Sequence, residues 1–176
     1  MSRLLTYPNR QMFDLLAPDP ATIHPEDIAT SLSHICRFTG HVRQFYSVAQ
    51  HCLLVAPLLP RELKFFGLMH DAHEAYVNDL ATPHKGLCAG YRATEDLAWA
   101  AVAERFGLPL TLPPEVKHAD LVALGMEKRD LTGEHPEQWP CLVGIELRPE
   151  PVIPYSSADA RYLWLDMFQS LGGKIR

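Results

Sequence analysis

Several features that would assign the chain to a special class are missing from its sequence. No apolar run approaches the roughly 20 residues that a membrane-spanning helix needs, and no segment resembles a signal peptide. The four cysteines are widely scattered and form no CxxC pair, which favours buried, reduced thiols. These absences predict a cytoplasmic protein without a membrane partner.

An excess of positive charge is also missing. The 176 residues carry a formal net charge of -5, so no global basic field is available to bind duplex nucleic acid. A small-molecule substrate is favoured instead, provided that positive groups gather locally. Apolar residues make up 47% of the chain, enough to bury one sizeable core, and we expect a single domain over residues 1–176.

Helical signals recur along the chain. Apolar residues return at helical spacing, prolines or serines stand at several starts, and glycines follow two of the ends. The predicted fold is a mostly α-helical bundle of about six helices, with at most a short β element from the N-terminal segment 3–20 and the C-terminal segment 145–156. The helices are expected over residues 24–38, 47–59, 60–77, 91–108, 113–131 and 156–173.

Polar side chains interrupt three of these apolar helices. The run "ELKFFGLM" leads directly into His70 and Asp71 of "HDAHEAYVND", His51 lies within "SVAQHCLLVA", and Asp120 lies within "VKHADLVAL". Burying such groups is costly unless something pairs with them, and a metal ion is one such partner. Two imidazoles with two carboxylates suit a divalent transition metal and leave positions open for water or substrate.

The H…HD…D pattern formed by His51, His70, Asp71 and Asp120 resembles the signature of the HD-domain metal-dependent phosphohydrolases. Three segments are also similar in sequence to the deoxynucleotide-hydrolysing branch of phages and bacteria, in particular to small phage enzymes that act on dATP. These segments are "SLSHICRFTGHVRQFYSVAQH", "HDAHEAYVNDLATPHK" and "VKHADLVAL". The resemblance implies an HD-type helical fold, those four residues as ligands of Co, Mn, Mg, Zn or Ni, and a homo-oligomer (dimer or hexamer) in a bacterial or phage-infected cytoplasm.

Glu74 stands one helical turn beyond His70, so a regular helix would place both side chains on the same face. The ligand set is complete without Glu74, which frees this residue to orient water or to protonate a leaving oxygen. The matching glutamate has that role in the resembling enzymes. Asp79 follows in a turn, and its counterpart there contacts the 3′-hydroxyl of the sugar. Both are predicted as catalytic residues, Asp79 also as a substrate contact.

Local cations are needed if this negatively charged protein binds a phosphate chain. Arg37 and Lys85 are the predicted phosphate contacts, and His41 is a third, proton-donating candidate. Base recognition is expected from apolar packing. Ile23 and Pro83 are the candidates for it, because they lie in segments that flank the site in similar enzymes.

Four functions follow as hypotheses. The first is hydrolysis of a deoxynucleoside triphosphate, with dATP favoured, to deoxynucleoside and inorganic triphosphate; the second is a 5′-deoxynucleotidase that acts on monophosphates. The third is a di-iron oxygenase, because His73, His84 and His118 lie between the HD doublet and Asp120, although a regular helix turns His118 away from the site. The fourth is a non-catalytic nucleotide-binding module, for which Glu74 would have no use.

Overall fold

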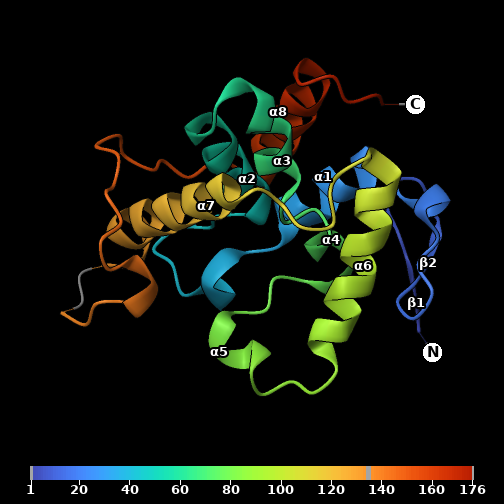
Figure 1. The fold of residues 1–176 in the computed structure, drawn as a ribbon, viewed down its shortest axis with the longest axis horizontal. Coiled ribbons are helices and arrows are strands. Elements are labelled where there is room, and N and C mark those ends of the chain that lie inside the picture. The colour runs from blue at the N-terminus through green and yellow to red at the C-terminus, as the bar shows by residue number, and fades with distance from the viewer. Residues whose placement is uncertain (1, 134–135, 176) are drawn as a thin grey trace.

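The computed structural model describes residues 2–133 and 136–175. The chain is mostly helical with one small antiparallel sheet, which confirms the predicted fold class (Figure 1). Within the described residues, no helix is both long and apolar enough to span a membrane.

The sheet is an N-terminal hairpin of strands β1 (Arg3–Leu5) and β2 (Met12–Asp14). A buried carboxylate fastens the hairpin to the helical body. Asp27, in the first turn of α1 (Pro25–His34), accepts hydrogen bonds from the Thr6 hydroxyl at 2.7 Å and the Asn9 backbone N–H at 2.9 Å. The β element predicted for the N-terminal segment is therefore present.

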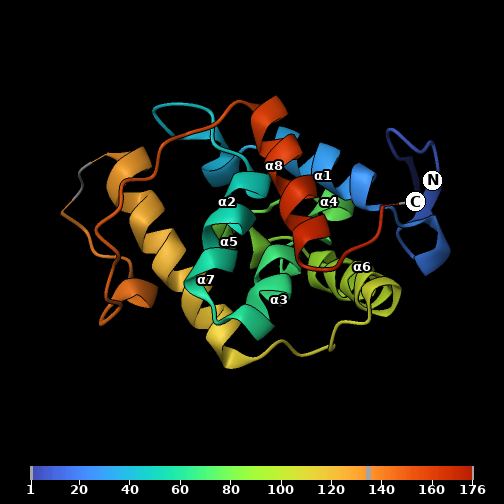
Figure 2. The ribbon, with the colours of Figure 1, turned by 90° about the horizontal axis from the view of Figure 1, so that it is seen from above.

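The helix α2 (Val48–Val55) lies at the centre of the molecule. It begins where predicted, because the Ser47 side chain accepts a hydrogen bond from the Gln50 N–H and so satisfies a free donor of the first turn. Figure 2 shows other helices around α2, and most residues of this helix, His51 included, are buried. The helices packed against it are α1, α3 (Lys64–Met69), α7 (Pro114–Glu127) and α8 (Ser157–Ser170).

The continuous helix predicted over residues 60–77 is wrong. A short 3-10 turn (η4, Arg61–Leu63) precedes α3, and α4 (Glu74–Val77) follows only after a turn. In that turn the N–H of Ala72 bonds to the carbonyl of Met69, and the N–H of Glu74 bonds to that of Asp71. These bonds span three residues instead of four, so the backbone is wound more tightly and its side chains are redirected.

A second difference lies in the segment expected to be a loop after α4. Residues Thr82–Lys85 form the short helix α5, which leads to α6 (Tyr91–Phe106). Gly107 ends α6 as predicted, with φ of 66° that glycine adopts without strain.

The short strand considered for residues 145–156 is absent from the described structure. This segment stays extended because the Gln50 side chain of α2 holds it, donating to the Ile153 carbonyl at 2.7 Å and accepting from the Tyr155 N–H at 2.8 Å. Its prolines lack the N–H groups that a sheet ladder needs. A helix thus takes the place of the partner strand.

The main core gathers apolar side chains from α1, α2, α3, α6 and α8, and Trp164 and Phe168 of α8 stack within it at 5.4 Å between ring centroids. The helix α7 packs on one side of this core and continues into a π-helical turn (η5, Lys128–Thr132) and, later, a 3-10 turn (η6, Pro140–Leu142). The layer between α2, α3 and α7 contains the predicted metal ligands.

Candidate metal centre

The four predicted ligands converge, although they come from three separate parts of the chain. His51 lies on α2, His70 and Asp71 lie in the turn after α3, and Asp120 lies on α7. The Nε2 atom of His51 is 3.3 Å from Nε2 of His70, 3.2 Å from Oδ1 of Asp120 and 3.6 Å from Oδ2 of Asp71. The Asp71 oxygen is in turn 3.1 Å from Nε2 of His70.

These separations match a shared ion. Ligand atoms held at about 2.1 Å from a tetrahedral zinc lie about 3.4 Å from one another, and the four measured distances run from 3.1 to 3.6 Å.

The hydrogen bonds of the two imidazoles also support a cation bound between these residues. His70 Nδ1 lies 2.8 Å from the Gly67 carbonyl and His51 Nδ1 lies 2.6 Å from a Glu127 carboxylate oxygen, so both Nδ1 atoms must carry the hydrogen. In the neutral rings each Nε2 then presents a lone pair, and the two lone pairs face each other beside two carboxylates. Such an arrangement requires a cation, either a proton or a metal ion, between these atoms.

The pKa shifts of His70 and Asp71 in the metal-free protein also indicate that the centre needs positive charge. Burial alone would lower the pKa of His70, yet the adjacent Asp71 carboxylate raises that pKa well above its ordinary value. Burial alone would raise the pKa of Asp71, yet the charge of His70 holds it well below its ordinary range. Without an ion, protons on the imidazoles therefore supply the missing positive charge.

Glu127 is a functional residue that the sequence reasoning missed. It is fully buried, and besides His51 it accepts from Arg37, whose Nε and NH2 lie 3.2 and 3.1 Å from Oε2. Burial alone would raise the pKa of Glu127, but Arg37 and His51 keep it lowered, so the residue stays ionised. A carboxylate behind a ligating histidine sets the orientation and basicity of that ring. The available signal was its position two helical turns after Asp120 on the same face of α7.

Arg37, predicted as a phosphate contact, is therefore already paired. Its side chain is buried between Glu127 and the metal centre, and its NH1 atom is 3.9 Å from Oδ2 of Asp71. Cys52 is a further missed neighbour, since its sulfur lies close enough to His70 and Asp71 to form a second group of potential ligands.

Glu74 begins α4, close enough to Asp71 and Asp79 for their charges to act on it, although the regular helix on which its prediction rested is broken at residues 70–73. The side chain is 4% exposed, and its Oε2 atom has no hydrogen-bond partner among the described residues. Burial, together with the negative charges of Asp71 and Asp79, raises the pKa of Glu74 well above its ordinary value. An unpaired, buried carboxyl group with a raised pKa has the properties of an acid-base group.

Asp79 borders an open hollow of about 460 Å³ that none of the four predicted ligands lines. Burial raises the pKa of Asp79, and the positive charge of Arg37 works against this rise. The volume falls in the range of small-molecule sites. The hollow is lined by residues of two segments, 34–39 and 78–84: His34, Ile35, Cys36, Thr39, Asn78, Asp79, Leu80 and His84.

The remaining predicted substrate contacts are scattered around this region. Lys85 lies on α5, with Nζ 2.7 Å from Oε1 of Glu95, and Pro83 is exposed on the same short helix. His41 is exposed at the end of the turn Arg37–Gly40. Ile23 differs from the expectation, because its side chain is fully buried in the main core and presents no surface to a ligand.

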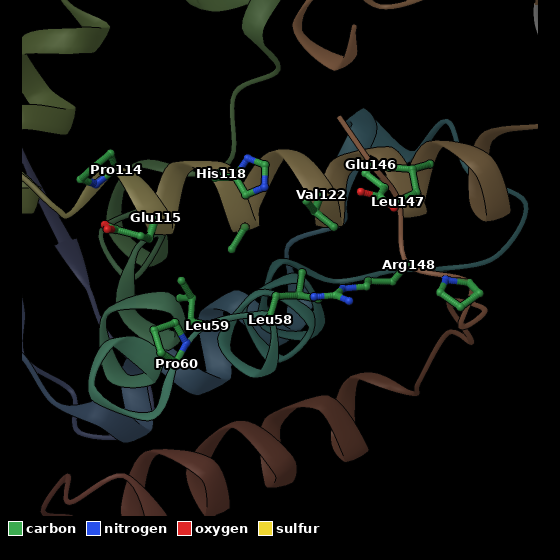
Figure 3. Close-up of a pocket in the computed structure, with 12 residues that line it drawn as sticks. Leu58, Leu59, Pro60, Pro114, Glu115, His118, Val122, Glu146, Leu147 and Arg148 are labelled. Carbon is green, nitrogen blue, oxygen red and sulfur yellow. The ribbon is translucent and has the colours of Figure 1, made fainter. Parts of the chain in front are cut away.

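The additional histidines considered for a di-iron site are not gathered. Neither His84 nor His118 belongs to any group of potential ligands within the described residues, whereas His73 lies in a separate group with Glu74 and Glu95. His118 instead borders a hollow of about 670 Å³ on the far side of α7, as its two-residue offset from Asp120 predicts (Figure 3). This hollow is thus distinct from the metal centre, because none of the four predicted ligands lines it.

The fold and this centre together describe a helical protein with a buried or half-buried group of side chains that could hold a metal ion. Comparison with known proteins adds two relatives. The chain is 40% identical to the Escherichia coli (strain K12) protein YfdR over 173 residues, which covers 97% of this chain and 96% of YfdR. It is also 36% identical over 154 residues to the Rhodobacter capsulatus protein RCAP_rcc00048, covering 80% and 77% of the two chains. The chain therefore belongs to the family of YfdR. No family model matches it.

Proposed function

We propose that this protein is a metal-dependent phosphohydrolase of the HD type that acts on deoxynucleotides, with dATP as the favoured substrate and deoxyadenosine and inorganic triphosphate as products. The observation that carries the proposal is the pair of facing Nε2 atoms of His51 and His70, 3.3 Å apart beside two carboxylates. The resemblance of the sequence to deoxynucleotide hydrolases supplies the substrate class.

His51, His70, Asp71 and Asp120 would hold one divalent ion, for which Co, Mn, Zn, Mg and Ni are the candidates. Such an ion lowers the pKa of a water molecule and neutralises phosphoryl oxygens. The protein's own contribution is to fix the ligands: Glu127 and the Gly67 carbonyl hold the two imidazoles, and the Lys117 ammonium donates to the outer oxygen of Asp120 at 2.7 Å.

In the proposed reaction a water molecule attacks the α-phosphorus, the bond between that phosphorus and the 5′-oxygen breaks, and the 5′-oxygen takes up a proton. Glu74 would donate or accept these protons, because its Oε2 atom is buried without a hydrogen-bond partner and its pKa is raised. Protonated, it can give a proton to the leaving oxygen; ionised, it can orient the water.

The hollow beside Asp79 is the proposed place of the nucleoside. Asp79 would accept a hydrogen bond from the 3′-hydroxyl of the sugar, and Lys85 and His41 would approach the phosphates from neighbouring segments. We further expect a cytoplasmic homo-oligomer, a dimer or a hexamer, as in the resembling enzymes.

A second candidate is a 5′-deoxynucleotidase that uses the same centre on monophosphates. The observation in its favour is that both predicted phosphate-binding cations already have carboxylate partners, Arg37 with Glu127 and Lys85 with Glu95. A short phosphate needs fewer free cations than a triphosphate.

A turnover panel tests the proposal. The four dNTPs, the four dNMPs and ATP are each incubated with the protein loaded with Co, Mn, Mg or Zn, and chromatography identifies the phosphate species released. Release of triphosphate from dATP is the expected result, whereas release of phosphate from monophosphates selects the second candidate. Absence of turnover under every metal contradicts both.

A further inference from the structure

We propose that His73, Glu74 and Glu95 bind a second divalent cation beside the first centre, and that this ion serves a polyphosphate chain. The donors come from three elements, the turn after α3, the start of α4, and α6. One ligand atom from each lies within 4.8 Å of the other two. None of the three belongs to the four-ligand centre. Glu74 would be a ligand of this ion once it is bound, so the proton-transfer role proposed above applies to the protein that carries only the first ion.

The geometry of this group is close to that of a bound ion. Nε2 of His73 is 3.9 Å from Oε1 of Glu95, compared with about 3.4 Å for two ligands of a tetrahedral ion and about 4.2 Å for two on opposite sides of an octahedral one. One imidazole and two carboxylates are also a mixture that Mn²⁺ and Zn²⁺ both accept.

Glu74 supplies the independent sign that a ligand is missing. Its side chain is 96% buried, and Oε2 has no hydrogen-bond partner among the described residues. A buried acceptor without a donor loses the full cost of its desolvation. Since a cation between Glu74 and Glu95 would satisfy this oxygen, the unpaired atom points to a site and not merely to a group of surface acids.

Lys85 now occupies the outer edge of the group. Its ammonium is 2.7 Å from Oε1 of Glu95, and its side chain is 25% exposed at the end of the short helix α5. The ammonium thus takes the place of the second ion in the metal-free protein. When the ion binds to Glu95, Lys85 can turn toward solvent, where a phosphate chain is within the reach of its flexible stem.

The role of this ion rests on the proposed function, whereas its existence does not. Arg37 and Lys85 are both engaged by carboxylates, and Asp71, Asp79 and Glu95 add negative charge around the site. These carboxylates would repel a triphosphate unless further positive charge were present at the site. Binding of a second ion would neutralise part of their charge and release Lys85, so two positive groups would become available to the β- and γ-phosphates.

The test counts Mn²⁺ ions bound to the full-length metal-free protein, by isothermal titration and by elemental analysis after dialysis. The expected result is about two ions per chain, and about one in Glu95→Gln and in His73→Asn. Asp96→Asn is the matched control, because Asp96 is the exposed neighbour of Glu95 on α6 and should leave about two ions bound. The ion that persists in the variants also reports that they are folded.

Two further measurements sharpen the test. The electron paramagnetic resonance spectrum of the Mn²⁺-loaded protein should show a coupled pair of ions, and this signal should disappear in Glu95→Gln. Lys85→Met should bind the second ion more tightly than the parent, because it removes the competing ammonium.

A single ion in the parent protein, or two ions in Glu95→Gln, would overturn the second site. The ion count tests the second site independently of the proposed function, since it requires no turnover. Triphosphate release by a protein with one ion would refute the second site alone. Two ions in a protein that hydrolyses no nucleotide would support the site and remove its link to polyphosphate.

Discussion

The two sides of α7 differ in a way that explains where chemistry is possible in this protein. On the inner side, Asp120 and Glu127 are drawn into a crowded layer in which each carboxylate contacts a charged or potentially charged partner. On the outer side, Glu115 and His118 are exposed and border a larger hollow that has an apolar floor from Leu58, Leu59 and Val122 (Figure 3).

Judged by volume alone, the outer hollow would be the candidate functional site, whereas the distribution of charged groups favours the inner layer. The outer polar groups are exposed to solvent, so water can satisfy their hydrogen bonds without a bound ligand. The inner groups are largely removed from water and are balanced mainly by one another, and two imidazole lone pairs face each other there. A candidate site is therefore better located from buried groups that lack a partner than from the size of a cavity.

The largest effect is expected from removing a ligand on the inner side. Asp71→Asn should lower phosphohydrolase turnover by more than about a thousandfold and abolish binding of the first ion, because an amide brings no negative charge to the centre. Turnover and bound metal are measured on the same preparation. Asp166→Asn, an exposed acid on α8, should keep both. Metal binding that survives Asp71→Asn would contradict the four-ligand centre.

Glu74→Gln should lower turnover by about 10²–10⁴-fold, because the amide cannot exchange protons in the reaction. The first ion should remain bound. Loss of that ion together with activity would instead make Glu74 a ligand of the first centre.

The same variant should stabilise the metal-free protein at neutral pH. Burial raises the pKa of Glu74 in the folded state, so the folded state holds a proton that the unfolded chain has already lost. Stability then falls as the pH rises from the ordinary carboxyl value through the raised one, and Glu74→Gln removes this loss. Thermal melts in chelator should show a gain at pH 7.5 and none at about pH 4. A variant less stable than the parent at pH 7.5 would contradict the sign.

A smaller effect is expected behind the ligands. Glu127→Gln should weaken binding of the first ion by about 10–100-fold, because His51 loses the carboxylate that orients it and raises its basicity. Metal affinity is measured by competition with a chelator. Glu115→Gln, on the outer side of the same helix, is the control and should bind the ion as the parent does. Equal affinities in the two variants would remove the distinction between the two sides of α7.

The smallest effect is expected in the outer hollow. His118→Gln should change turnover by less than about twofold and unfolding free energy by less than about 0.5 kcal/mol, because His118 is exposed and belongs to no ligand group. Steady-state kinetics and chemical denaturation measure the two quantities. A large loss of activity would show that the outer hollow takes part in the reaction.

Local signals in the sequence determined most of the helix starts and the glycine end of α6, whereas several predicted helices run past their observed ends. Ser47, Pro25 and Gly107 act within one turn of their own positions, so their effects could be predicted without knowing what packs nearby. The candidate ligands were visible for a related reason, since polar residues next to apolar helical runs are costly to bury without a partner.

The tertiary structure alone decided what those polar groups contact. The capture of the extended segment by Gln50, the pairing of Arg37 with Glu127 and that of Lys85 with Glu95 all join elements that are separate in the sequence. Local propensity is insensitive to such contacts, because a buried charge is stabilised by whichever partner the packing brings within reach.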